Sequence, residues 1–247
     1  MKKILFIISI IFIMASCNKN KDITTPTVTI SFDQQLVSSN SMTRTTSNEF
    51  LDIIEKQTPT YVNVTLKNLD LNKTFTCKSN ETITIPIGNY EISAKCVTPS
   101  CEYVIGTSGL MYKTPIIKCN SFSHFISNTT QVVTLNCFYN CYAVFALIDE
   151  CKSCVAYYYD NNVNFSKNGK YYIAYFNYTE SRGMDIRLTP YDDSNDFITT
   201  TYNFSTTYDV NKVYAEYGKY YVIHPQLVSK TTSSFIIDLP KMTEGEI

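Results

Sequence analysis

Two cysteines three positions apart carry the plainest chemical signal in this chain of 247 residues. Cys151-Lys-Ser-Cys154 has the spacing used for thiol–disulfide exchange and for half of a zinc site. A redox motif needs a helix start to lower the thiol pKa. Here Asp149-Glu150 would raise that pKa instead, and the tyrosines from Tyr157 onward favour a strand. We therefore predict a structural disulfide and keep a thiol–disulfide protein as a weaker alternative.

Other catalytic and metal-binding patterns are missing from the sequence. The two histidines, His124 and His224, lie a hundred residues apart, and Cys151-x-x-Cys154 has no second matching pair. A nucleophile elbow of the form Gly-x-Ser-x-Gly is also absent. We predict a protein without enzymatic activity, metal or cofactor.

The remaining cysteines suggest cross-links if the chain is exported. Eight of the nine cysteines follow Cys17, and an even number in an exported chain indicates disulfides. Cys96 could pair with Cys101 across a tight turn, and Cys119 could meet Cys137 from a neighbouring strand. The alternative is a set of buried free thiols that act as small apolar residues. The candidate disulfide cysteines are Cys77, Cys96, Cys101, Cys119, Cys137, Cys141, Cys151 and Cys154.

The N-terminus has the layout of an export signal that ends at a cysteine. Lys2 and Lys3 precede an apolar run from Ile4 to Met14, which is too short to span a bilayer. The sequence Ile13-Met-Ala-Ser-Cys17 resembles the bacterial lipobox, in which the cysteine becomes the lipidated first residue. The resemblance implies a lipid anchor at Cys17 and a location at the bacterial outer membrane or cell surface.

Charge argues against a polyanionic partner. Loss of Lys2 and Lys3 with the signal changes the formal net charge from −1 to −3. Basic residues do not cluster in a way that would follow a phosphate backbone. We therefore expect no binding of nucleic acid.

The elements that carry these residues are predicted to be strands with one short helix. Tyrosine, phenylalanine, threonine and branched aliphatic residues dominate, which favours strands. The sequence Thr46-Ser-Asn-Glu49 fits a capping box for a helix that stops before Pro59 and plugs one end of a β domain. From Tyr61 the pattern has period two, and Tyr142 to Ile148 is apolar throughout, as in a buried central strand.

A turn signal suggests the type of β domain. Ile85-Pro86 and Gly88-Asn89-Tyr90 predict a hairpin, and the phrase resembles the turn of many transthyretin-like and immunoglobulin-like sandwiches. We predict an all-β fold of two such sandwich domains with one short helix. The expected divisions are a lipoprotein signal peptide (1–16), a polar tether and lead segment (17–46), a first sandwich (47–140) and a second sandwich (141–247).

Clustered tyrosines raise a second functional possibility. Tyr157 to Tyr159, Tyr171-Tyr172 and Tyr220-Tyr221 could form an aromatic surface that stacks on sugars. Adjacent residues of a strand point to opposite faces, so a tyrosine-rich core is the preferred interpretation.

The whole layout resembles the fimbrillin-like lipoproteins of Bacteroidales. In that family a lipidated precursor is cut after an arginine in its lead segment, and a strand of another subunit fills the groove that opens. The resemblance implies lipidation at Cys17, cleavage at Arg44 in Ser41-Met-Thr-Arg-Thr-Thr46, and a strand-donating subunit as partner. The eight further cysteines depart from the family pattern. The alternative is a monomeric surface lipoprotein that binds a glycan or protein ligand.

Overall fold

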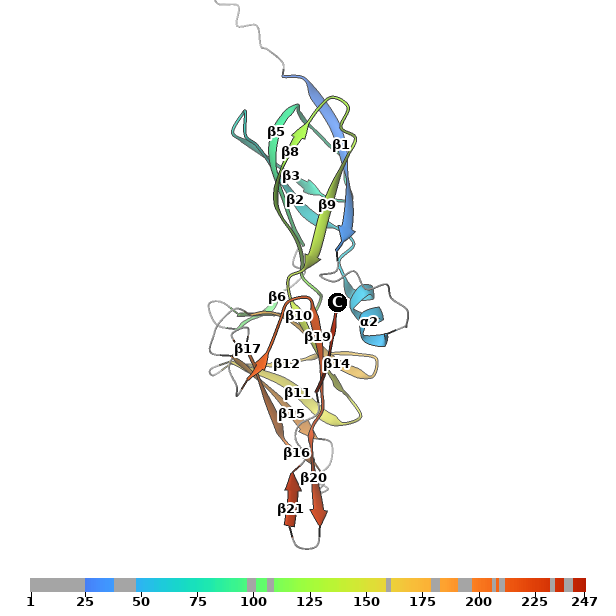
Figure 1. Cartoon of the computed structure of the whole chain (residues 1–247), viewed down its shortest axis with the longest axis vertical. Coiled ribbons are helices and arrows are strands. Elements are labelled where there is room, and N and C mark those ends of the chain that lie inside the picture. Colours follow the sequence, from blue (N-terminus) through green and yellow to red (C-terminus); the bar gives the residue numbers. More distant parts are fainter. Residues whose placement is uncertain are drawn as a thin grey trace, which may run out of the picture.

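The computed structural model shows an elongated molecule in which β-strands dominate (Figure 1). In the part of the chain that it describes, a single helix, α2 (Glu49–Gln57), accompanies the strands, and the predicted all-β class is confirmed. No helix among these residues is both long enough and apolar enough to cross a bilayer. The described residues are 25–37, 48–96, 101–105, 109–158, 161–178, 183–190, 197–205, 208, 212–231, 234–237 and 242–247.

A seven-stranded sheet forms the N-terminal end of the molecule, with the order β3-β2-β5-β8-β9-β1-β4. Alternate residues of β2 and β5 are buried, as the period-two pattern predicted, because one face of each strand lines the core. The strands are β1 (Thr27–Leu36), β2 (Val62–Asn68), β3 (Lys73–Lys78), β4 (Ile83–Pro86), β5 (Gly88–Cys96), β8 (Ile117–Ile126) and β9 (Val132–Tyr139).

Three further sheets form the other end of the molecule. Their orders are β22-β19-β10-β14-β7-β6, with β13 also paired to β14, then β12-β11-β15-β17-β18, and β16-β20-β21. The strands are β6 (Cys101–Ile105), β7 (Gly109–Tyr112), β10 (Tyr142–Leu147), β11 (Cys151–Tyr158), β12 (Asn161–Asn164), β13 (Ser166–Asn168), β14 (Tyr171–Tyr178), β15 (Met184–Pro190), β16 (Phe197–Ile198), β17 (Thr200–Ser205), β18 (Val213–Tyr214), β19 (Lys219–Ile223), β20 (Gln226–Thr231), β21 (Ser234–Ile237) and β22 (Met242–Glu246).

Strand β10 is the central buried strand that its apolar run predicted. It pairs with β14 on one side and with β19 on the other. Tyr142 and Val144 point into the core between the sheets of this end, whereas Ala143 and Phe145 belong to a second core that continues into the N-terminal sheet. A strand that is covered on both faces needs apolar side chains at every position, which explains the unbroken run.

Helix α2 covers the outer face of the sheet that contains β10. The Phe50 ring lies 5.1 Å from those of Phe145 and Tyr171 and 5.4 Å from that of Tyr220. Sequence reasoning placed this helix at the end of a β domain and proposed Thr46 as its cap. The structure instead gives Asn48 as the N-cap, whose side chain accepts a hydrogen bond from the Phe50 amide. Thr46 lies outside the described residues.

Sheet pairing crosses the proposed domain boundary near residue 140. Strands β6 and β7 precede that boundary in sequence, yet β7 pairs with β14 of the second group. The division of the chain into domains at 47–140 and 141–247 stays a prediction.

The predicted hairpin at Gly88 is wrong. Strand β4 pairs with β1, whereas β5 pairs with β2 and β8, so the chain changes neighbours at this turn instead of folding back on itself. The Tyr90 hydroxyl donates to the Pro86 carbonyl at 2.7 Å and fixes the corner. A turn between two strands that do not pair with each other uses the same Gly-Asn turn residues as a hairpin, so the local sequence did not distinguish the two.

Candidate functional site

Strand β1 occupies a seat formed by two other strands of the N-terminal sheet. Its first half, Thr27 to Ile30, pairs antiparallel with β4, and its second half, Ser31 to Leu36, pairs parallel with β9. Figure 1 shows β1 running lengthwise beside β9. We call β4 and β9 together the β1 seat.

Apolar side chains, polar side chains and backbone hydrogen bonds together hold β1 in its seat. Ile30 is fully buried, and Val28 and Phe32 pack partly against the same core. Polar side chains add to these contacts: Thr29 bonds to Thr84 at 2.7 Å, the Ser31 hydroxyl donates to the Gln131 carbonyl at 3.1 Å, and the Ser79 hydroxyl donates to Gln34 Oε1 at 2.9 Å. The backbone supplies the other hydrogen bonds, including one of 2.7 Å from the Val37 amide to the Cys137 carbonyl. The apolar side chains and the row of backbone hydrogen bonds are contacts that any strand of suitable alternation can supply, whereas the polar side-chain bonds depend on the sequence of β1.

The two residues with the most specific predicted roles, Cys17 and Arg44, lie outside the described residues. In the sequence, Arg44 falls between the end of β1 at Leu36 and the start of α2 at Glu49. A cut there would leave β1 on one fragment, and α2 with the later strands on the other.

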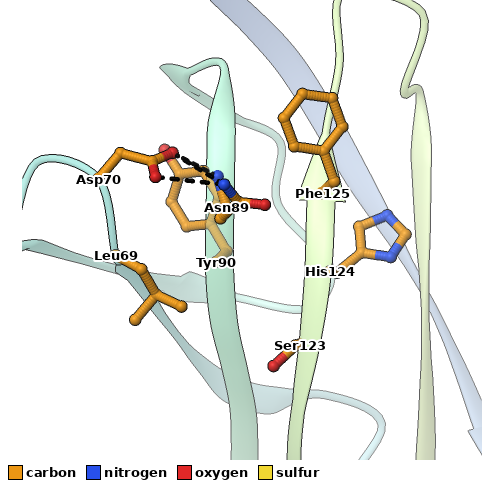
Figure 2. Close-up of a pocket in the computed structure, with 7 residues that line it drawn as sticks. All are labelled: Leu69, Asp70, Asn89, Tyr90, Ser123, His124 and Phe125. Carbon is orange, nitrogen blue, oxygen red and sulfur yellow. Dashed lines mark hydrogen bonds between the residues drawn. The ribbon is translucent and has the colours of Figure 1, made fainter.

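A second candidate site is a pocket of about 420 Å³ at the N-terminal end of the molecule. Figure 2 shows Leu69 and Asp70 of the β2–β3 turn on one side, Asn89 of β5 in the middle and Phe125 of β8 on the other side. Asn89 and Phe125 are direct cross-strand partners and therefore share the outer face of the sheet. The other lining residues are Tyr90, Ser123 and His124.

Asp70 is held in this pocket by its neighbour on β5. The Asn89 amide donates to Asp70 Oδ2 at 2.7 Å, and Asn89 Nδ2 donates to Asp70 Oδ1 at 3.2 Å. These two bonds, the backbone one first, lower the pKa of the Asp70 carboxyl below its usual value. Asp70 is therefore ionised at neutral pH and presents a fixed negative charge.

Glycine is required where the chain passes Asp70. A Cβ on Gly88 would lie 2.6 Å from Asp70 Oδ2, and the backbone φ there is +155°. The β2–β3 turn is fixed from its other side by Asn68, whose Oδ1 accepts a hydrogen bond from the Leu71 amide at 2.7 Å. The pocket is thus shaped by hydrogen bonds of Asn68, Asp70 and Asn89 before any ligand enters.

The cysteines are free thiols in the structure. This holds for Cys77, Cys96, Cys119, Cys137, Cys141, Cys151 and Cys154, of which all but Cys77 are buried. Burial raises the pKa of Cys141 to about 12, and burial with the neighbouring thiol of Cys119 raises that of Cys137 to about 12. For Cys101 the structure describes the place in β6 but not the side chain. The expected disulfides stay a prediction.

The Cys151-x-x-Cys154 motif lies on a strand, β11, as its following tyrosines predicted. Burial, and then the charge of Glu150, raise the pKa of Cys151 to about 12, and burial raises that of Cys154 as well. A thiol–disulfide enzyme needs the opposite shift. Within the described part of the chain, no three side chains of the metal-binding types come together.

The tyrosine clusters contribute mainly to the core. Tyr171, Tyr172, Tyr220 and Tyr221 are each at most 8% exposed. The pocket residues Asp70, Asn89 and Phe125 were not identified from sequence. Phe125 alternates with buried Ile126 in a strand, which is a usable signal for an outward-facing aromatic residue.

Comparisons with known proteins give neighbours at the level of overall architecture. No protein-family profile and no curated protein matches the sequence. Among solved structures, the chain is similar to the tip fimbrial protein Mfa3 of Porphyromonas gingivalis, with a TM-score of 0.45, 7% identity, and coverage of 76% of this chain and 94% of that one. A candidate cell adhesion protein of Bacteroides uniformis gives a TM-score of 0.43 and 9% identity, covering 75% and 90%. Another, from Bacteroides eggerthii, gives 0.42 and 10%, covering 90% and 96%. These similarities are too low to support a functional conclusion.

Proposed function

We propose that this chain is a lipid-anchored protein of the bacterial cell envelope with a structural or adhesive role, similar to a fimbrillin subunit or pilus anchor. The role is non-enzymatic. The observation that carries the proposal is the position of β1, which pairs with β4 and β9 and is joined in sequence to the later elements through the segment that contains Arg44.

Removal of β1 would leave an incomplete sheet. Ile83 to Pro86 of β4 and Val132 to Cys137 of β9 would lose their pairing partner on that side. Unpaired strand edges bind added strands, because each backbone donor and acceptor needs a partner. Cleavage at Arg44 would therefore convert a closed subunit into one that accepts a strand from a second copy.

Arginine is rare enough in this chain to make the cleavage testable. The only arginines are Arg44, Arg182 and Arg187. Arg187 lies within β15, where its guanidinium stacks over the Tyr157 ring at 4.4 Å. An arginine-specific protease should cut the folded chain after Arg44 and leave Arg187 intact.

The experiment treats the unlipidated full chain with such a protease and follows mass and assembly by native mass spectrometry and light scattering. We expect a product that begins at Thr45, loss of the β1 fragment and formation of oligomers. The Arg44→Ala variant, which keeps β1 attached, is the matched control and should stay monomeric. Processed chains that remain monomeric after complete loss of β1 would refute strand exchange.

The second candidate function is an anchored surface protein that binds a ligand and keeps β1. The pocket beside Asp70 favours it, since strand exchange has no use for that site. Protein taken from its native membrane distinguishes the two. An N-terminus at lipid-bearing Cys17 with Arg44 still joined to Thr45 supports an anchored binder or pilus anchor, whereas an N-terminus at Thr45 supports a processed subunit.

A further inference from the structure

We propose that the pocket between the β2–β3 turn and β8 binds a neutral hexopyranose unit of a glycan, with Phe125 stacked on the sugar ring and Asp70 and Asn89 bonded to its hydroxyl groups. No lining residue belongs to β1. The proposal is therefore independent of strand exchange.

The apolar side of the pocket is formed by the ring of Phe125, which is largely exposed to solvent. Phe125 is 58% exposed, and Leu69 across the pocket is 49% exposed. Large apolar side chains that gather on the surface around polar groups mark binding sites more often than single exposed ones do. An aromatic face has a negative π surface that attracts polarised hydrogens, and one face of a pyranose ring presents C–H groups of this kind.

The polar side offers hydrogen-bond acceptors at fixed positions. A carboxylate has about four acceptor sites, and the bonds from Asn89 use only part of those on Asp70. Because the Asn89 NH₂ group faces Asp70, its carbonyl oxygen points away from Asp70 and into the pocket (Figure 2). Bonds from sugar hydroxyls to an ionised acceptor are stronger than bonds between neutral groups.

The pocket is ordered before binding. The Leu69 amide donates to the Asn89 carbonyl at 2.8 Å, and Asn68 fixes the turn that carries Asp70. A site whose groups are already in place spends less of its binding free energy on ordering. The volume of about 420 Å³ is within the range of small-ligand sites and suits one sugar ring.

The chemistry of the lining distinguishes a sugar from a charged ligand. A lysine or arginine side chain of a ligand could pair with Asp70 and stack on Phe125. Such a side chain carries only hydrogen-bond donors, so it could not bond to donor groups of the pocket. Ser123 lies on the same outer face as Phe125, and its hydroxyl can donate as well as accept, which matches hydroxyl groups. Glu91, the cross-strand partner of Ser123, adds a second carboxylate to the same face of the sheet and disfavours acidic sugars.

The test uses the full chain with Arg44→Ala, so that β1 stays in place. The probes are an array of neutral oligosaccharides ending in glucose, galactose or mannose, together with their sialylated counterparts and a lysine-rich peptide. Calorimetry on the best neutral probe then gives the affinity. We expect binding to neutral probes only.

Three substitutions locate the binding. Phe125→Ala should weaken it at least about tenfold, in line with the loss of an aromatic stack and its buried area. Phe125→Tyr keeps the aromatic ring, so this variant should bind with an affinity within about threefold of that of the parent protein. Asp70→Asn should weaken it by removing the charge while keeping an acceptor for the Asn89 amide.

Two exposed residues outside the pocket are matched controls. Tyr208→Ala removes an aromatic ring that is 77% exposed, and Asp149→Asn removes an exposed carboxylate. Neither should change the affinity, and circular dichroism should show that every variant is folded. Preference for the lysine-rich peptide, binding unaffected by Phe125→Ala, or failure to bind any neutral probe would overturn the proposal. None of these results would bear on oligomer formation after cleavage at Arg44.

Discussion

At the scale of single residues, the corner at Gly88 joins the fold and the pocket. Its missing side chain allows Asp70 to reach the Asn89 amide, and Tyr90 locks the same corner through Pro86. Sequence reasoning recognised Gly88-Asn89 as a turn, which was correct. It could not reveal the approach of Asp70, because a contact across nineteen residues depends on which strands pair.

Gly88→Ala should destabilise the chain by about 2 kcal/mol, since the new Cβ would overlap Asp70 Oδ2 and the φ of +155° is strained for alanine. Gly169→Ala is the control. It also has a positive φ, of +58°, but nothing lies within 4 Å of the added carbon, so it should cost only about 1 kcal/mol. Urea unfolding measures both. Equal losses at the two sites would contradict the predicted overlap.

The pKa of the Asp70 carboxyl should lie below the ordinary value of an aspartate in the folded protein, because the Asn89 amide and side chain donate hydrogen bonds to it. A lowered folded-state pKa means that the bonds from Asn89 stabilise the fold above the unfolded-state pKa and that this contribution is lost as pH falls through the folded-state pKa. Asn89→Ala should raise the Asp70 pKa part of the way back, because the backbone bond remains. Carbon-detected NMR titration measures it, with Asn120→Ala as a control that should leave Asp70 unchanged.

At the scale of elements, β10 was predictable and α2 was only partly so. The run from Tyr142 to Ile148 has no polar residue at which one face could meet solvent, and this indicated a strand covered on both sides. The apolar face of α2 was also predictable from the sequence, but it did not indicate against which sheet Phe50 would pack. The rings that contact Phe50 belong to Phe145, Tyr171 and Tyr220, which lie on three strands distant in sequence.

Phe50→Ala should lower the free energy of unfolding by about 3 kcal/mol, because it removes a ring that contacts three others and leaves a cavity beneath the helix. Lys56→Ala, at an exposed position of the same helix, should cost less than about 0.5 kcal/mol. Denaturant unfolding compares the two. A small effect of Phe50→Ala would mean that α2 is not docked on this sheet in solution.

The strand pair β8–β9 offers a suitable geometry for a disulfide, because Cys119 and Cys137 are cross-strand partners. The Asn140 amide bonds to the Ile116 carbonyl, and bonded pairs alternate along an antiparallel ladder, so Cys119 and Cys137 form a non-bonded pair whose side chains approach closely. We propose that a thiol oxidant of the cell envelope takes two electrons and two protons from this pair to join it.

Unreduced peptide mapping should then recover the Cys119–Cys137 link, and reducing agent should lower the melting temperature by several degrees. Cys119→Ser should abolish the link and the sensitivity to reductant, while Cys77→Ser, at a half-exposed thiol of β3, should leave both unchanged. Free thiols at both positions, with an unchanged melting temperature, would favour the alternative that these cysteines only fill space in the core.

At the scale of the whole molecule, the two ends share one continuous set of contacts. One apolar cluster includes Ile30 of β1, Ile54 of α2 and Phe145 of β10. The division of the chain near residue 140 was hard to judge from sequence for this reason, since no linker composition marks the place where β6 and β7 join the other group of strands.

Cys17→Ala should move the protein from the membrane fraction to the soluble fraction, because an acyl chain contributes about 0.8 kcal/mol for each buried methylene group. Cys77→Ala, which removes a cysteine of the folded part, should stay with the membrane. Fractionation followed by immunoblotting measures both. Continued tight membrane association of the Cys17→Ala protein would refute the lipid anchor.

The direction of β1 has a mechanical consequence for a chain tethered at its N-terminal end. Tension would enter at Pro26 and act along the strand, while Ser31 to Leu36 run parallel to β9. Hydrogen bonds between the strands lie across that direction, so a pull loads the whole row in shear and does not open it one bond at a time. The covalent connection between β1 and α2 adds no resistance to this load until the row has slipped. The mechanical resistance of an uncleaved chain would therefore depend on the contacts of β1 with β4 and β9. A strand that replaced β1 would have to form the same contacts.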